Sequence, residues 1–136
     1  MEDLSPERRL AVAIASAAAD KKALDIVIMD VEGILSYTDY LVLCSGRSDR
    51  QVAAIADGVA RAVRDEDNTR RPLGVEGSRG GRWVLMDFGD VVLHVFHEDA
   101  RGFYDLERLW YDAVRVDPAT GEDFPSSPTA ASPTGG

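Results

Sequence analysis

The sequence has a single cysteine among its 136 residues, so no disulfide can form within the chain. Cys44 lies inside the apolar run YLVLCSG, where a free thiol is typically a small buried hydrophobic group. We therefore expect an inert thiol and a reducing compartment. Long apolar runs are also missing: no stretch has the length of a membrane-spanning helix, and the N-terminal MEDLSPERR lacks an apolar signal core. These absences predict a soluble, cytoplasmic protein without a membrane partner.

Positive charge is scarce. Fifteen Lys and Arg residues stand against twenty-four Asp and Glu, which gives a formal net charge of −9. The last twenty residues hold three of the acids and no Lys or Arg, so the rest of the chain is still acidic. Such a balance argues against a broad nucleic-acid-binding face and favours a basic partner. The alternative is that the charge only keeps the protein soluble.

Motifs for the common catalytic and cofactor chemistries are missing as well. No G-x-S-x-G elbow, P-loop lysine motif or G-x-G-x-x-G after a strand occurs. His94, His97 and Glu98 resemble a metal-ligand set, but positions three apart on an extended strand point to opposite faces. We therefore expect no catalytic residue, no cofactor and no metal.

One acidic pair leaves an enzymatic alternative open. Asp30 and Glu32 lie on one side of a predicted strand end, at the spacing with which a nucleotidyltransferase holds two magnesium ions. Such an enzyme also needs a Gly-Ser loop before that strand and a third carboxylate. The nearest loop here, Gly46-Arg47-Ser48, follows the strand, and no third carboxylate is evident. Acids at strand ends are more commonly solvated surface groups.

Hydrophobic periodicity predicts an α/β domain over residues 1–116, with a single mixed β-sheet of about five strands and helices packed on it. Ser5 and Ser48 are expected to cap two helices, and Gln51 to complete a capping box with Ser48. The remaining elements predicted are strands at 24–31, 39–45, 73–76 and in the stretch 83–96, and a final helix over 100–114 with Phe103, Leu106, Trp110 and Ala113 on one stripe. Residues 117–136, rich in Pro, Ser and Gly, are predicted to form a disordered tail.

The stretch WVLMDFGDVVLHVF, residues 83–96, predicts a hairpin that turns at Gly89-Asp90, because glycine accepts the positive φ of such a turn. This turn sets the register. One face is then wholly apolar and belongs to the core. The other face combines aromatic and polar side chains: Trp83, Leu85, Asp87, Val92, His94 and Phe96.

The mixed face has two interpretations. Large aromatic side chains with polar groups are typical of an interface anchor, which makes this face a candidate docking surface. Alternatively, a helix covers it, or it joins two copies into a homodimer. The neighbouring loop, residues 77–82, carries two arginines that could touch a phosphate backbone, or it only connects two strands.

Five segments in this order and spacing resemble the ribosomal silencing factor RsfS family, also called the Iojap family: DIVIMDVEG, TDYLVLCSGRSDRQV, GVEG, WVLMDFGDVVLHVF and RGFYDLERLW. The resemblance runs from about Leu10 to Trp110 and leaves out the tail after Val116. It implies a fold similar to nucleotidyltransferases without their active site, and hence no enzyme.

The resemblance also implies a partner. The family binds the large ribosomal subunit at ribosomal protein fourteen of that subunit, blocks its association with the small subunit and represses translation under nutrient limitation. On this basis, the mixed hairpin face would be the ribosomal-protein-binding site, with a minor contact to ribosomal RNA as a further expectation. Its predicted residues are Trp83, Leu85, Asp87, His94 and Phe96, extended by Glu76 and Tyr104.

Overall fold

The computed structural model describes residues 4–66, 72–77, 82–104 and 113–123, and the side chains of residues 102–104 fall outside that description. Its helices are interspersed with single strands and with groups of consecutive strands along the chain, which fits a mixed sheet covered by helices. They are α1 (Pro6–Asp20), β1 (Leu24–Asp30), β2 (Tyr40–Gly46), α2 (Asp49–Glu66), β3 (Gly74–Glu76), β4 (Trp83–Asp87), β5 (Val91–His97), α3 (Glu98–Tyr104) and β6 (Val114–Val116).

Both long helices begin at the predicted serines. The Ser5 hydroxyl accepts a hydrogen bond from the Arg8 N–H at 3.1 Å, and the Ser48 hydroxyl accepts one from the Gln51 N–H at 3.0 Å. The reciprocal half of the capping box differs from the prediction. The Gln51 side chain accepts from the N–H of Arg47, not of Ser48, because its amide also reaches across to donate to the carbonyl of Lys22.

The strands form one mixed six-stranded sheet in the order β3-β4-β5-β2-β1-β6. The central pair, β2 and β5, is parallel, and the other neighbours are antiparallel. The α/β class and the mixed sheet are therefore confirmed, with one strand more than the five expected.

The predicted hairpin register is confirmed residue by residue. Trp83 lies opposite Phe96, Leu85 opposite His94 and Asp87 opposite Val92. Gly89 takes a φ of +92°, which allows the tight turn.

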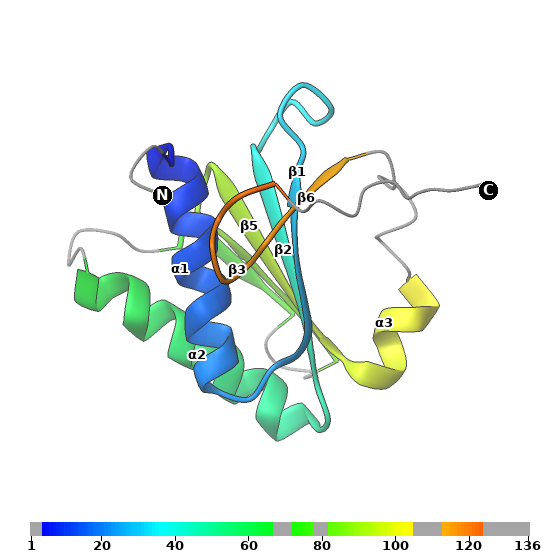
Figure 1. The fold of residues 1–136 in the computed structure, drawn as a ribbon. Helices are drawn as coiled ribbons and strands as arrows, with labels where there is room; N and C mark the ends of the chain where they lie inside the picture. Colours follow the sequence, from blue (N-terminus) through cyan, green and yellow to red (C-terminus); the bar gives the residue numbers. More distant parts are fainter. Residues whose placement is uncertain (1–3, 67–71, 78–81, 105–112, 124–136) are drawn as a thin grey trace.

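The two faces of the sheet are covered unequally. Figure 1 shows α1 and α2 side by side on one face, where their apolar stripes meet the larger core cluster. The other face carries a smaller cluster built from Met29, Leu41, Leu43, Val92 and Phe96, with Trp83 and Leu85 packed at its margin. Among the described elements, the short helix α3 is the one that lies on this side.

The final helix of the prediction was partly wrong. α3 ends at Tyr104, and Ala113 and Val114 are not helical, although the stripe was expected to include Ala113. Val114–Val116 instead forms β6, which pairs with β1 at the edge of the sheet and supplies the sixth strand. The middle of the predicted helix, including Leu106 and Trp110, lies outside the described residues.

Residues 117–123 form an ordered turn, which we call the C-terminal turn, in a segment for which we expected disorder. The N–H of Asp117 donates to the carbonyl of Glu122 at 2.8 Å, and the N–H of Gly121 donates to the carbonyl of Asp117 at 2.8 Å. Gly121 is buried against α1, near Leu4 and Val12. The folded body thus continues to Asp123, while residues 124–136 lie outside the described part and their disorder stays a prediction.

Candidate functional site

Trp83 lies at the start of β4 on the mixed face of the hairpin and is half-buried. Its indole stacks on the ring of Phe96, the residue directly opposite on β5, with ring centroids 5.1 Å apart and an interplanar angle of 28°. The imidazole of His94 completes what we call the aromatic cluster, with its ring nearly parallel to that of Phe96 at 9°. Cross-strand aromatic pairs of this kind stabilise a sheet.

A hydrogen bond joins the two polar members of the cluster. The indole Nε1–H of Trp83 donates to Nδ1 of His94 at 3.0 Å. An imidazole nitrogen accepts only when it carries no proton, so His94 must be neutral here. Burial favours that state, since it lowers the pKa of His94 to about 4.

A small cavity opens beside the indole. It has a volume of about 200 Å³ and is lined by Glu76, Gly77, Trp83 and Leu85. We call it the Trp83 pocket. Glu76 is exposed and Leu85 is half-buried, so the pocket combines an apolar wall with a carboxylate. Three of the predicted site residues therefore come together around one cavity, on two neighbouring strands.

Gly77 is a pocket residue that sequence reasoning did not single out. Its φ is +79°, and a Cβ added there would lie 2.1 Å from the carbonyl oxygen of Trp83. Only glycine allows this approach. The sequence signal that could have identified Gly77 was its place at the start of a glycine-rich loop. Residues 78–81 of that loop lie outside the described residues, and so does the predicted contact to ribosomal RNA.

The other predicted site residues occupy different positions. Phe96 is fully buried and His94 is 6% exposed, so both lie beneath the accessible surface and support Trp83 from below. Asp87 is half-buried, and its carboxylate accepts the N–H of Gly89 at 2.7 Å, which ties it to the hairpin turn. The side chain of Tyr104 lies outside the described residues.

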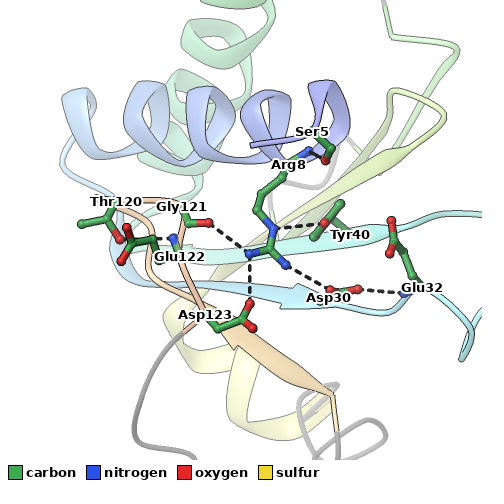
Figure 2. A network of polar contacts seen from close by, with 9 residues as sticks. All are labelled: Ser5, Arg8, Asp30, Glu32, Tyr40, Thr120, Gly121, Glu122 and Asp123. Carbon is green, nitrogen blue, oxygen red and sulfur yellow. Dashed lines mark hydrogen bonds and ion pairs between the residues drawn. The ribbon is translucent and has the colours of Figure 1, made fainter. Parts of the chain in front are cut away.

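In the acidic pair of the nucleotidyltransferase alternative, the carboxylate of Asp30 is engaged in structural contacts, whereas Glu32 takes part through its backbone N–H (Figure 2). Oδ2 of Asp30 forms an ion pair with the guanidinium of Arg8 at 3.2 Å, and Oδ1 accepts the N–H of Glu32 at 3.0 Å. Both carboxylate oxygens of Asp30 thus have protein partners. Desolvation and the nearby carboxylates of Asp30 and Asp39 raise the pKa of Glu32.

Arg8 also connects α1 to the C-terminal turn (Figure 2). Its guanidinium donates to Tyr40 Oη at 3.1 Å, to the Gly121 carbonyl at 3.1 Å and to Asp123 Oδ1 at 2.9 Å. Partial burial disfavours the charged form, but the hydrogen bonds with Tyr40 and Asp123 outweigh it and raise the pKa of Arg8. Arg8 therefore links α1 to the start of β2 and to the C-terminal turn.

The other groups that could carry chemistry are the thiol of Cys44 and the possible metal ligands. Cys44 is fully buried, and burial raises the pKa of its thiol to about 12, so the thiolate needed for nucleophilic chemistry does not form near neutral pH. Within the described ranges, no group of His, Cys, Asp and Glu side chains could hold a metal ion. No helix among the described residues is long and apolar enough to span a bilayer.

Comparison with known proteins decides what kind of molecule carries this site. Residues 4–134 match the family described as "Ribosomal silencing factor during starvation". The chain belongs to the ribosomal silencing factor family. The family match includes most of the tail that we had placed outside the pattern, so that expectation was wrong.

Individual members of the ribosomal silencing factor family agree with this assignment. The chain is 48% identical over 105 residues to the ribosomal silencing factor RsfS of Bacillus subtilis, covering 76% of this chain and 86% of that one. A more distant relative, 31% identical over 98 residues, is the mouse "Mitochondrial assembly of ribosomal large subunit protein 1"; the match covers 71% of this chain and 43% of that one. A crystal structure of a Chromobacterium violaceum protein is also similar, with a TM-score of 0.75 and 33% identity over 79% of this chain and 88% of that one.

Ribosomal silencing factors are non-enzymatic regulators of the ribosome, so family membership confirms the prediction that this chain is not an enzyme. It also confirms the prediction of a role in translation regulation. The structural contacts of the Asp30 carboxylate agree with this.

Proposed function

We propose that this chain docks on the large ribosomal subunit, on its ribosomal protein fourteen, through the Trp83 pocket and its rim. The bound factor blocks joining of the small subunit and represses translation when nutrients are limiting. The observation that carries the proposal is the Trp83 pocket itself, where a rigidly held indole, an apolar wall and an exposed carboxylate adjoin one cavity. Such a combination is typical of an interface anchor with a polar rim.

The edge of the sheet beside the pocket also exposes apolar side chains, although on its other face. On and beside the edge strand β3, Leu73 is 77% exposed and Val75 is 47% exposed. Val75 lies opposite Met86 and faces the side of the sheet that carries α1 and α2, whereas Glu76 lies opposite Leu85 and faces the pocket. A protein partner that wrapped around this edge strand would cover both the pocket and these side chains.

Charge supports a basic partner. The chain has a net charge of −9, and Glu76 places a carboxylate at the pocket. Ribosomal proteins are commonly basic because they pack on RNA, so opposite charge steers the factor towards an exposed protein patch and away from bare phosphate. The name of the mouse relative, "Mitochondrial assembly of ribosomal large subunit protein 1", also refers to the large subunit.

This mechanism requires no catalytic step. Two ribosomal subunits join over large surfaces in one fixed geometry, and a folded domain bound at their margin excludes the second subunit by its volume. Affinity for one site on the large subunit is sufficient. A cytoplasmic location follows from this role.

The test is cosedimentation of the purified chain with separated large and small subunits, followed by addition of small subunits to measure joining. Trp83→Ala should weaken binding about thirtyfold, because a buried aromatic anchor commonly contributes about 2 kcal/mol. Tyr37→Ala is the matched control, since Tyr37 is an aromatic residue that is 62% exposed in the loop between β1 and β2, at the opposite end of the sheet. Equal binding by both variants, or cosedimentation with small subunits, would contradict the proposal.

Two alternative hypotheses predict different experimental results. A homodimer formed through the same face would appear in light scattering across a dilution series, and Trp83→Ala would dissociate it. A nucleotidyltransferase-like protein would bind nucleotide in the presence of magnesium, and Asp30→Asn or Glu32→Gln would abolish that binding. A docking factor binds no nucleotide, and Glu32→Gln leaves its cosedimentation unchanged.

A further inference from the structure

We propose that His94 is a positioning residue for docking: its unprotonated Nδ1 holds the indole of Trp83 in the orientation that forms the wall of the Trp83 pocket. The inference rests on the proposed docking function and adds to it a residue that the partner does not touch. His94 is 6% exposed, so it acts through Trp83 and not through direct contact.

The indole of Trp83 is restrained in two directions. Phe96 supports one ring face, with the ring centroids 5.1 Å apart. Stacking sets the spacing and tilt of the two rings, but a stacked ring can still turn within its own plane. The hydrogen bond from Nε1 to His94, at 3.0 Å, removes that freedom, since hydrogen bonds require both distance and angle.

The pocket depends on this orientation. Trp83 and Leu85 form its apolar wall, and Glu76 and Gly77 line the rest. An indole that turned away from His94 would change the shape of a cavity of only about 200 Å³. A surface already in its bound shape loses less entropy on binding, so the hydrogen bond should increase affinity without contacting the partner.

The protonation state of His94 follows from its surroundings. Desolvation is the cause that lowers its pKa to about 4, and no hydrogen bond or ion pair with a charged group is seen for His94 among the described residues. On the same side of the sheet, Glu76 and Asp87 lie on β3 and β4, and Arg101 of α3 donates to the hydroxyl of Ser45 at 3.0 Å. At neutral pH the acceptor is therefore always available, which makes His94 a permanent support for Trp83 and not a sensor of physiological pH.

A double-mutant cycle on the full chain tests the inference, with the dissociation constant for large subunits as the readout. His94→Leu removes the acceptor and replaces the imidazole with an apolar side chain of similar size. This variant should bind large subunits about fivefold more weakly. Trp83→Phe keeps an aromatic ring but removes the donor. Added to Trp83→Phe, His94→Leu should then have little further effect. His94→Asn, whose side-chain oxygen lies close to the position of Nδ1, should recover most of the lost affinity.

The free protein gives an independent readout. The indole N–H resonance of Trp83, assigned by comparison with Trp110→Phe, should shift when the pH falls towards about 4, because imidazolium cannot accept the hydrogen bond. His94→Leu should move the same resonance at neutral pH, while thermal unfolding checks that the variant folds. If His94→Leu does not fold, the Trp83→Phe and His94→Asn variants still decide the matter.

The outcomes separate the two proposals. If wild type cosediments with large subunits but His94→Leu and Trp83→Phe bind as tightly as wild type, the positioning role is overturned and docking stands. Additive losses in the cycle also overturn it, because the two side chains would then act independently. If wild type does not cosediment at all, the docking function fails, whatever the indole resonance shows.

Discussion

At the scale of single residues, the position of Trp83 depends on a glycine as much as on its aromatic neighbours. Gly77 takes a φ of +79°, and its backbone passes so close to the Trp83 carbonyl that a methyl group would not fit between them. β3 and β4 can approach each other at this corner only because the side chain is absent. The same corner lines the pocket.

Gly77→Ala should lower the free energy of unfolding by roughly 1–3 kcal/mol, because it adds both backbone strain and a clash with a carbonyl group. Urea denaturation measures the loss. Gly74→Ala, three residues earlier on β3, is the matched control, since a Cβ there would meet nothing within 4 Å. Equal stability of the two variants would show that the corner can relax, and that Gly77 does not set the position of Trp83.

At the scale of elements, the hairpin was predictable because its register depends on one local signal. Gly89 at the turn fixes every pair between Trp83 and Phe96, and the structure has those pairs. The seven candidate site residues were less well defined by the sequence. Pattern alone placed His94 and Phe96 on the same face as Trp83 but could not tell that both are buried, because burial depends on segments distant in sequence.

The last elements were mispredicted for a related reason. Val114–Val116 is only three residues long and directly follows the predicted helical stripe that ended at Ala113, so its alternation is too short to mark a separate strand. The C-terminal turn has the polar composition of a disordered tail, yet it is held by Arg8, a residue on the first helix. No local pattern contains that partner, so the order of residues 117–123 could not be read from the sequence.

Arg8→Met should destabilise the protein by roughly 1–3 kcal/mol, since it leaves the half-buried carboxylate of Asp30 without its cation and frees the C-terminal turn from α1. Thermal and urea unfolding report this change. Arg9→Met is the matched control: Arg9 is exposed, and none of the hydrogen bonds among the described residues involves its side chain. A loss of similar size in both variants would mean that helix α1 needs positive charge in general and not the specific contacts of Arg8.

At the scale of the whole molecule, the net charge of −9 should act on the speed of docking more than on its final strength. The association rate constant with large subunits should fall by about tenfold between roughly 50 mM and 300 mM salt, as expected for electrostatic steering. Stopped-flow mixing or surface-based kinetics would measure it. Trp83→Ala should raise the dissociation rate and leave the salt dependence of association unchanged, because it removes no charge.

A pair of charge variants locates the steering surface. Glu76→Gln and Asp57→Asn each remove one negative charge, but Glu76 lines the pocket whereas Asp57 is exposed on α2, which covers the opposite face of the sheet. Glu76→Gln should slow association more. A larger effect of Asp57→Asn would mean that the partner approaches the helical face.

The contact between Arg8 and Asp123 spans 115 positions of sequence, which has a consequence for how the protein is made. A ribosome synthesises α1 early and Asp123 more than a hundred residues later, so during elongation Arg8 lacks its ion pair with Asp123. Closing a loop of that length costs chain entropy. The contacts that offset this cost form only when β6 has paired with β1. The described fold is therefore closed only after Asp123 has been synthesised, so a regulator of ribosomes cannot make this contact while the residues before Asp123 are still being translated.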